Sequence, residues 1–521
     1  MIKKEYSSTR TPSAFFYNGI SSTVSAIALR ASAMLFNVYL SSTAGAGAMG
    51  LLSLVYSVWG FALTLGCVSG GFLSSRIYAS ESSLGGNVYR GSSMCVRFTF
   101  ICGAFIGTLL FFGSDALSFW VLEDARCSIP LKILAFSLPF ISASGAIEGY
   151  FNACTRSYKA AGMRMCEQLI RISVTAFAFL LLGHKNDRDA CINIVLSGAI
   201  TEIISFTLLL ALFIRDRCTH LEKTTSPAIS TYREMASLVL PLTLSTGMRS
   251  ALTSIEHIMI PKGLVSHGSA YNDALSLFGT IHGMALPVVL FCFSVPSSFA
   301  SLLIPRIAEL SARKNKKEIS YVAGRAYRLA TCFSFAVAAF IILSSKVLGN
   351  ILYPGTSAGI YVYVLAPLIP IMYIDSVSDS FLKGLNCQLY SMRINIIDSI
   401  ISLVCVVFLI PRLGISGYIV AIYASETFNT CASLVKVLKK TGYKIPVTRY
   451  VIIPLLCAIF SAKLTKGAYI LLCTHHSGLL FPLLSAAVFF TATYFILLTL
   501  TRNITEDEKR WIKVLVKSPI K

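Results

Sequence analysis

Long apolar segments separated by short polar ones run along almost the whole chain. A helix that crosses the hydrocarbon core of a bilayer needs about 20 largely apolar residues, so these segments are long enough to span a membrane. The pattern predicts fourteen membrane helices, over residues 14–40, 48–70, 94–113, 130–151, 162–183, 191–214, 235–260, 276–304, 322–345, 359–382, 391–411, 415–436, 448–469 and 478–501. The predicted fold class is therefore an all-α polytopic membrane protein.

The composition supports the same class of protein. Of the 521 residues, 55% are hydrophobic and 13% are charged, and the mean hydropathy is +0.71. A soluble domain carries about 25% charged residues, so an ordinary soluble enzyme is excluded. The 15 cysteines are scattered, with no Cys-x-x-Cys pair and no Cys/His ligand spacing. The sequence therefore predicts neither a disulfide framework nor a metal site.

The basic residues predict how the helices are oriented. With the N-terminus inside, 33 of the 45 Lys and Arg residues lie in or beside cytoplasmic segments, nine lie in or beside external segments, and Arg30, Arg171 and Arg249 lie within helices. The positive-inside rule then predicts that both termini are cytoplasmic. The net charge of +21 reflects this orientation and attraction to anionic membrane lipids, not nucleic-acid binding. We expect a monomer in a bacterial cytoplasmic membrane.

The loops predict how the chain is divided. The predicted parts are an N-terminal lobe of six helices (1–215), a cytoplasmic linker (216–233), a second six-helix lobe (234–440), two further helices (441–502) and a cytoplasmic amphipathic tail (503–521). Gly149-Tyr150-Phe151 and Ser380-Phe381-Leu382-Lys383-Gly384 both follow the fourth helix of a half and lead into the fifth through a basic loop. Because duplicated halves are common in transporters, this echo supports the division into two six-helix lobes.

Several ionisable side chains fall within the predicted membrane helices, where each costs at least about 2.5–3.5 kcal/mol unless it has a partner or a watery cavity. Arg249 and Glu256 are seven residues apart and share a helix face. That face either lines a cavity, where Arg249 would hold an anionic headgroup, or pairs with neighbouring helices. We favour the cavity, because the cost excludes a position that faces lipid.

Asp375 and Asp379 are four residues apart, with Lys383 another four residues on, so all three share a face. Two carboxylates in a membrane can hold Na⁺ or a proton, which is the chemistry of ion coupling. The alternative is a structural contact between helices, or an Asp379–Lys383 ion pair at the cytoplasmic end. The sequence leaves both interpretations open.

Glu167 and Arg171 are also four residues apart, in the order that favours an ion pair. A structural pair is favoured over direct contact of Arg171 with a substrate. Glu202 and Glu426 are either packing contacts or members of a proton relay, and they remain candidates for ion coupling.

Several stretches of the chain resemble one family. Residues 255–264 (IEHIMIPKGL), 281–287 (IHGMALP), 301–305 (SLLIP), 148–151 (EGYF), 167–171 (EQLIR) and the segment from Gly50-Leu51 to Ser75-Arg76 carry the likeness. They are similar to the stage V sporulation protein B-like branch of the multidrug/oligosaccharidyl-lipid/polysaccharide exporter superfamily, to which lipid II flippases are related. The likeness covers most of the chain.

The resemblance implies fourteen helices, two six-helix lobes around a central cavity, and flipping of polyprenyl-diphosphate-linked saccharides. The charges fit this role. A cationic cavity formed by Arg30, Arg249 and Arg171 would hold the diphosphate while the polyprenyl tail stays in lipid. Glu256 would hold Arg249 when the cavity is empty.

Two other functions are weighed against the flippase. A cation-coupled multidrug exporter of the same superfamily needs acids and aromatic residues in its cavity, and the Asp375/Asp379 pair supports it. A membrane-embedded glycosyltransferase or acyltransferase needs catalytic acids or a histidine in sizeable loops, and the sequence has no such constellation. The sequence therefore favours a transporter over an enzyme. No cofactor is expected beyond Na⁺ or H⁺ as a coupling ion.

Overall fold

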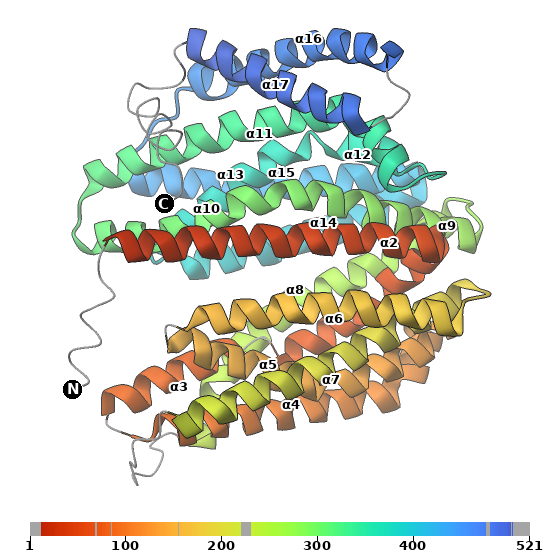
Figure 1. Cartoon of the computed structure of the whole chain (residues 1–521), viewed down its shortest axis with the longest axis vertical. Coiled ribbons are helices and arrows are strands. Elements are labelled where there is room, and N and C mark those ends of the chain that lie inside the picture. Colours follow the sequence, from red (N-terminus) through yellow and green to blue (C-terminus); the bar gives the residue numbers. More distant parts are fainter. Residues whose placement is uncertain are drawn as a thin grey trace. The chain divides into compact units, whose positions relative to one another are not determined.

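The computed structural model describes residues 12–501 and 503, apart from 68–69, 85, 155, 220–230 and 476–479 (Figure 1). The α-helices are α2 (Pro12–Cys67), α3 (Gly70–Leu84), α4 (Val88–Ala116), α5 (Ser128–Ala153), α6 (Ser157–Leu182), α7 (Asp187–Thr219), α8 (Tyr232–Ser266), α9 (Tyr271–Phe278), α10 (Leu286–Ala312), α11 (Lys316–Leu352), α12 (Ala358–Leu365), α13 (Leu368–Gly384), α14 (Gln388–Leu413), α15 (Ile415–Thr441), α16 (Ile453–His475) and α17 (Leu480–Leu500). Short π-helices, η1 (Leu117–Val121), η3 (Gly279–Ala285) and η4 (Thr448–Ile452), and a 3-10 turn, η2 (Ala125–Cys127), join them. The predicted amphipathic tail lies outside the described residues, except for Asn503.

The predicted all-α membrane class is confirmed. In the described residues, ten helices are long and apolar enough to cross a membrane, or eleven if the pair α12 and α13, bent by 53°, forms one span. The first two predicted spans correspond to the two parts of α2, which meet at a kink, and neither α8 nor α15 is among the ten. The number of fourteen spans stays a prediction.

A glycine explains how α2 holds two predicted spans. Gly45 has φ 82° and ψ 169°, which is not helical, so the helix is kinked there. This region of backbone space is open almost only to glycine, because other residues carry a Cβ atom. The predicted break between residues 40 and 48 is therefore present as a kink and not as a loop.

Asparagine side chains begin two of the other helices. The Asn87 side chain accepts a hydrogen bond from the backbone N–H of Arg90 at the start of α4. The Asn315 side chain accepts one from the N–H of Glu318 at the start of α11. Each cap satisfies a donor that the first turn of a helix leaves without an internal partner.

The chain forms two compact units. Unit 1 contains Met1–Met284 and Asn395–Ile422, and unit 2 contains Ala285–Ile394 and Tyr423–Lys521. Their boundaries differ from those of the predicted six-helix lobes, which stay a prediction. Within unit 1, α4 and α7 pack on α5, α6 packs on α7, and α2 contacts α8 and α9.

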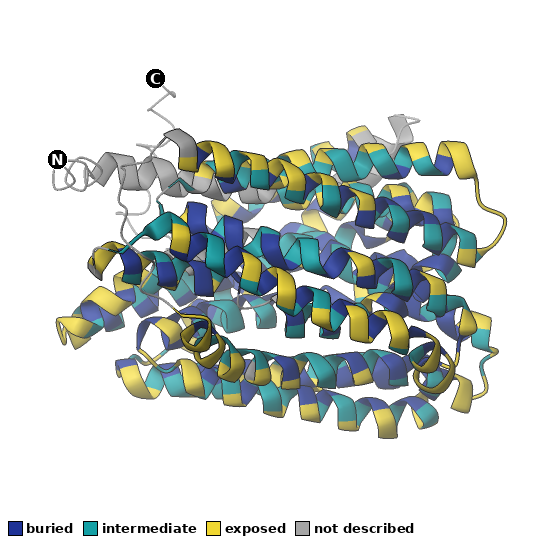
Figure 2. Ribbon diagram, turned by 90° about the horizontal axis from the view of Figure 1, so that it is seen from below, coloured by how far each residue is buried: buried dark blue, intermediate teal, exposed yellow. Residues whose placement is uncertain are grey.

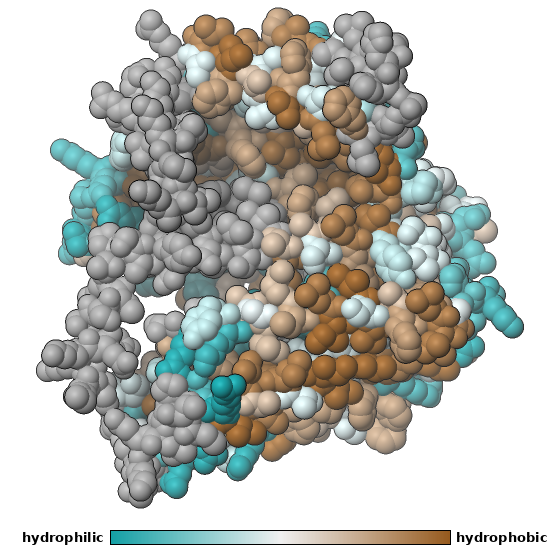
Figure 3. All heavy atoms as spheres, in the orientation of Figure 1, coloured by the Kyte–Doolittle hydropathy of each residue, from teal (hydrophilic) through white to brown (hydrophobic). Residues whose placement is uncertain are grey.

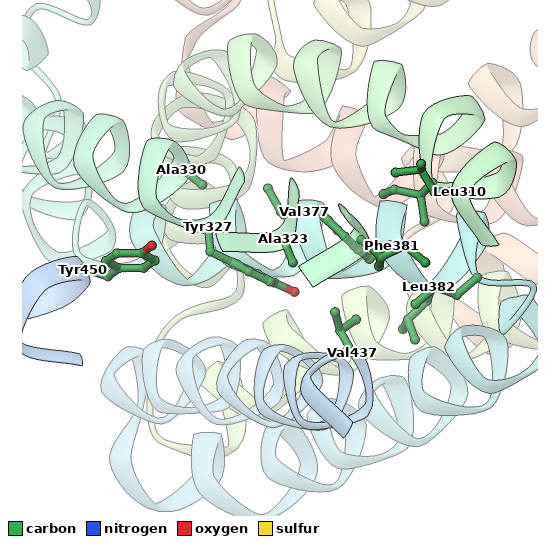
Figure 4. Close-up of a cluster of buried hydrophobic side chains, with 12 residues drawn as sticks. Leu310, Ala323, Tyr327, Ala330, Val377, Phe381, Leu382, Val437 and Tyr450 are labelled. Atoms are coloured by element: carbon green, nitrogen blue, oxygen red, sulfur yellow. The ribbon is translucent and has the colours of Figure 1, made fainter. Parts of the chain in front are cut away.

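Unit 2 is built around α10, α11 and α13, with α16 and α17 packed on one another (Figure 1). Its core includes Tyr327, Phe381 and Val437, drawn from α11, α13 and α15 (Figure 4). The rings of Tyr327 and Phe381 stack with centroids 5.9 Å apart. The Tyr327 hydroxyl lies 2.9 Å from Ser378 Oγ, so its polar end is satisfied within the core.

Many helices expose large apolar side chains. Phe105 and Phe112 of α4 and Leu180 of α6 are exposed, while other residues of the same helices are buried (Figure 2). On the face seen in Figure 3, hydrophobic residues cover the middle of the helices and hydrophilic residues lie toward their ends. Exposed apolar surface on this scale is unusual for a soluble monomer and suits contact with lipid. The protein is therefore a multi-pass membrane protein.

Candidate functional site

Unit 1 contains a cavity of about 340 Å³ that is lined by α2, α8 and η3. Its volume falls within the range of small-molecule sites. The lining residues are Asn37, Met49, Leu52, Ser53, Tyr56, Ser57, Gly60, Ser250, Thr253, Ser254, His257, His282 and Gly283. None of these described lining residues is Asp, Glu, Lys or Arg. Most of the wall is apolar, and its polar groups are hydroxyl groups, one amide and two imidazoles, without a fixed charge.

Helix α8 presents a polar stripe to the cavity. Ser250, Thr253, Ser254 and His257 follow the spacing i, i+3, i+4 and i+7, which places them on one helix face. Hydroxyl groups are the main polar groups of this stripe. Each hydroxyl has one donor and two acceptor sites, and the protons of Ser250, Thr253 and Ser254 are donated to backbone carbonyl oxygens. The hydroxyl groups of the stripe can therefore accept hydrogen bonds from a ligand.

Hydrogen bonds along this stripe join α8 to α2. Ser254 Oγ donates to the carbonyl oxygen of Ser57 at 2.7 Å, and Thr64 Oγ1 donates to Ser250 Oγ at 3.1 Å. Ser250 Oγ lies 3.4 Å from the carbonyl oxygen of Gly60 and donates to it. After these bonds, the Ser254 hydroxyl keeps two acceptor sites for a ligand and the Ser250 hydroxyl keeps one.

Two histidines face one another in the cavity wall. The Nε2 atoms of His257 on α8 and His282 on η3 are 3.2 Å apart, and the ring centroids are 4.3 Å apart. One Nε2 must donate a proton and the other accept it, and the tautomers decide which does so. Phe278 packs against both rings. Nothing in the sequence pattern pairs these histidines, although each lies in a motif that carries the family resemblance.

A close backbone approach holds the second wall of the cavity. A Cβ atom on Gly279, the first residue of η3, would lie 2.3 Å from the carbonyl oxygen of Ala46 on α2. A Cβ atom on Gly50 would lie 2.1 Å from the carbonyl oxygen of Leu275 on α9. Only glycine fits at either position, so the absence of two side chains brings His282 to the cavity.

The predicted headgroup-binding residues lie beside the cavity and not in its lining. Arg249 is exposed and directly precedes the lining residue Ser250, and Arg30 is exposed on α2, two turns before Asn37. The Glu256 carboxylate accepts a hydrogen bond from Ser402 Oγ of α14 at 2.6 Å rather than from Arg249. Contact of Arg30, Arg249 and Glu256 with a substrate stays a prediction.

Arg171 joins two carboxylates on neighbouring helices. Its Nη2 atom lies 2.8 Å from Glu167 Oε1 on α6 and 2.6 Å from Glu202 Oε1 on α7. Ser205 Oγ donates to the second oxygen of Glu167 at 3.2 Å. The sequence pairs Glu167 with Arg171, and the structure adds Glu202 to this pair. Tyr56, which lines the cavity, interacts electrostatically with Arg171 and Glu202, so the cluster lies near the cavity wall.

The remaining candidates for ion coupling lie in unit 2. Asp379 Oδ2 pairs with Lys383 Nζ at 2.7 Å, and Asp379 also accepts a hydrogen bond from Ser391 Oγ. This arrangement matches the structural alternative left open by the spacing. Asp375 on α13 and Glu426 on α15 are half-buried. Neither they nor Asp379 and Glu202 are among the residues that line the cavity, and their role in coupling stays a prediction.

The sequence reasoning missed one buried carboxylate, Asp216 at the end of α7. It accepts from Arg156 Nη1 at 2.7 Å, from Lys159 Nζ at 2.6 Å and from the Tyr150 hydroxyl at 2.9 Å. The network ties the end of α5 and the start of α6 to α7. The EGYF motif and the basic loop after it were visible in the sequence, but their acidic partner lies about 60 residues away along the chain.

The described residues hold no group of three or more His, Cys, Asp or Glu side chains that could bind a metal ion.

Comparisons with known proteins agree with the motifs in the sequence. The MatE family profile matches residues 280–408. The chain is 23% identical to Stage V sporulation protein B of Bacillus subtilis (strain 168) over 431 residues, which cover 81% of this chain and 82% of that protein. The resemblance predicted from residues such as 255–264 and 281–287 is thereby confirmed.

Solved structures share the architecture. One described as the lipid II flippase MurJ in an inward closed conformation has a TM-score of 0.69 at 13% identity, covering 92% of this chain and 98% of that chain. An inward-facing multidrug resistance MATE family transporter of the MOP superfamily has a TM-score of 0.63 at 12% identity, covering 81% of this chain and 98% of that chain. This polytopic helical chain thus shares the overall fold of these two solved structures.

Proposed function

We propose that the chain is a transporter, not an enzyme, and that it flips a polyprenyl-diphosphate-linked saccharide across the bacterial cytoplasmic membrane by alternating access. The observation that carries the proposal is the cavity lining, in which hydroxyl groups of α2 and α8 are the main polar groups. A sugar presents hydroxyl groups that can donate hydrogen bonds, and these match the acceptor sites of such a wall. Similarity to a lipid II flippase and to Stage V sporulation protein B supports the same substrate class.

The lining also distinguishes between the two transporter functions. An organic cation needs an acid or an aromatic face to offset its loss of water. Among the described lining residues, none carries a carboxylate, and Tyr56 is the only Phe, Tyr or Trp. A neutral saccharide needs no such charge, so the lining favours a sugar headgroup.

The diphosphate requires cations near the headgroup, and the exposed Arg249 and Arg30 beside the cavity are the candidates. Arginine can donate two parallel hydrogen bonds to a phosphate, whereas lysine supplies a point charge. Arg171 is the third candidate, but Glu167 and Glu202 already hold it. We therefore assign the first contact with the diphosphate to Arg249.

The proposal includes a membrane setting. Both termini are cytoplasmic, the basic loops contact anionic lipids, and a monomer is sufficient because the cavity lies within unit 1. Na⁺ or H⁺ is the coupling ion if transport is coupled. The matching MatE profile keeps a cation-coupled multidrug exporter as the alternative.

Reconstitution tests the proposal. Purified protein in proteoliposomes should move fluorescent undecaprenyl-diphosphate-linked disaccharide-pentapeptide between leaflets, with imposed Na⁺, H⁺ and voltage gradients identifying the coupling. Arg249→Ala should slow flipping about ten- to hundredfold, because a hydrogen bond to a charged group contributes about 1.5–3 kcal/mol. Arg249→Lys should restore the rate in part.

Arg233→Ala is the matched control, because Arg233 is an exposed arginine in the first turn of α8, whereas Arg249 lies in the middle of that helix. It should flip at the wild-type rate. Normal flipping by Arg249→Ala would reject the assignment of Arg249 and leave the function intact. Export of an organic cation such as ethidium, without flipping of the lipid, would reject the flippase in favour of the drug exporter.

A further inference from the structure

The two facing imidazoles of the cavity can hold only a limited number of protons. Their Nε2 atoms are 3.2 Å apart, so a single proton lies between them. In the uncharged pair, one ring donates from Nε2 and keeps a free Nδ1, while the other ring accepts at Nε2 and carries its own proton on Nδ1. An added proton can therefore bind the free Nδ1 without breaking the contact.

A second added proton is a different matter. It would have to bind the accepting Nε2, and two N–H groups would then point at one another across 3.2 Å. Two like charges this close repel strongly. The geometry thus admits one added proton and resists the next.

The pair is the main titratable group among the described residues of the cavity wall. Apart from Tyr56, the other described lining residues do not ionise. In the described parts of the elements around the pair, the other titratable and charged side chains are Arg30, Tyr39 and Tyr56 of α2, Tyr232, Arg233, Glu234, Arg249, Glu256 and Lys262 of α8, Tyr271 and Asp273 of α9, and Tyr390, Arg393, Asp398, Cys405 and Arg412 of α14. Of these, Glu256 follows Ile255 and precedes His257, but its carboxylate is bonded to Ser402 of α14.

We propose that His257 and His282 together form the proton-binding site of this transporter, which takes up one proton with the anionic headgroup of its substrate. The proposal rests on the proposed function for its substrate and on the geometry of the pair for its proton. A histidine pair suits this task because imidazole changes charge between about pH 5 and 8.

The added proton gives a cavity without fixed charge a single positive charge. That charge lies in the same wall as the hydroxyl stripe of α8, so the sugar and a phosphate can be bound together. By linkage, a headgroup that binds the protonated pair more tightly must raise proton uptake by the pair. Release of the headgroup on the other side then releases the proton.

A proton count tests the pair without any substrate. Wild type and His257→Gln/His282→Gln in lipid nanodiscs are titrated over about pH 5 to 9. Wild type should bind one proton more than the double variant. A difference of two protons, as for independent histidines, or of none would overturn the proposal.

His267→Gln is the matched control, because His267 also belongs to the end of α8 but is exposed and contacts the carbonyl oxygen of Pro411. It should leave the proton uptake by the pair unchanged. If the double variant does not fold, histidine NMR of wild type decides the same question. His257 and His282 should then titrate together, with one proton between them, and independent titration would overturn the proposal.

The second arm uses the undecaprenyl-linked disaccharide-pentapeptide in proteoliposomes with a pH gradient. Wild-type flipping should change about tenfold when the gradient is reversed, and His257→Gln/His282→Gln should lose that dependence. If both proteins flip the lipid at rates that the gradient does not alter, the proton site is rejected and the flippase stands. If neither flips it but the wild type binds the extra proton, the flippase fails and the proton site stands.

Discussion

The Glu167–Arg171–Glu202 cluster and the cavity wall lie in the same unit but hold their helices in opposite ways. In the cluster, one guanidinium joins two carboxylates on α6 and α7 at 2.8 and 2.6 Å. In the wall, α2, α8 and η3 are joined by serine-to-backbone hydrogen bonds and by glycine contacts. The comparison shows that the charges of the cluster balance one another. The described lining of the cavity, by contrast, has no fixed charge until a ligand or a proton binds.

The largest expected effect comes from breaking the ion cluster. Arg171→Ala would leave two half-buried carboxylates without their cation. Breaking a buried pair costs about 3–5 kcal/mol, and this half-buried cluster should reach the lower end of that range. The thermal unfolding midpoint in detergent should fall clearly.

Arg188→Ala, at an exposed position of α7, is the control and should leave the midpoint unchanged. An unchanged midpoint in Arg171→Ala would mean that the cluster does not hold α6 to α7. The contrast with the cavity wall would then lose its basis.

A smaller effect is expected from the glycine contact of the wall. Gly279→Ala places a methyl group where the carbonyl oxygen of Ala46 would lie 2.3 Å away, so η3 must shift. Overpacking of this kind costs about 1–3 kcal/mol. The shift should also separate His282 from His257 and remove the dependence of transport on the pH gradient.

Gly198→Ala in α7 serves as the comparison, because a Cβ atom there meets nothing within 4 Å. It should keep both the stability and the pH dependence of wild type. If Gly279→Ala behaves like Gly198→Ala, the close approach of η3 to α2 does not position the histidine.

The smallest effect concerns Asp124, which lies in the turn between η1 and η2. Asp124 accepts hydrogen bonds from Arg126 and from the Tyr271 hydroxyl at the start of α9. Burial raises the pKa of Asp124, but the hydrogen bonds and the charge of Arg126 outweigh burial and hold this pKa below its usual value. The contribution of Asp124 to stability is therefore complete above about pH 4, which is the pKa of an aspartate in the unfolded chain. This contribution is lost as the pH falls through the lower pKa that Asp124 has in the folded protein.

Asp124→Asn should lower stability at neutral pH by about 1 kcal/mol, as for a pair that is partly open to solvent. The difference from wild type should shrink as the pH is lowered toward about 3, in unfolding measured across this range. Asp273→Asn, at an exposed acid in the first turn of α9, should show no such convergence. A constant difference at every pH would mean that the carboxylate of Asp124 does not supply the stability.

The sequence predicted the class of fold well because a bilayer permits few alternatives. Backbone groups in lipid must be bonded within the segment, so an apolar stretch of sufficient length becomes a helix. The rule does not show that residues 40–48 continue α2 through a kink at Gly45. Nor does it identify the bend between α12 and α13, since both depend on packing.

The site was harder to predict, and α8 shows why. Periodicity says that Arg249 and Glu256 share a face and that Ser250 and His257 share another, about 100° away. It does not say which face meets the cavity, because the rotation of a helix about its axis is set by its neighbours. The structure turns Ser250 and His257 inward. Pairing of His257 with His282, and of Asp216 with Arg156, likewise depends on contacts between distant segments.

The kink at Gly45 has a consequence for how the chain can mutate. A Cβ atom at Gly45 would meet nothing within 4 Å, so the restriction comes from its backbone angles and not from crowding by neighbours. Every other residue is disfavoured there in the same way, whatever its size. At Gly279, by contrast, the obstacle is a neighbouring atom that a change elsewhere could move. A genetic screen should therefore find second-site suppressors for substitutions at Gly279, but none that act by making room at Gly45.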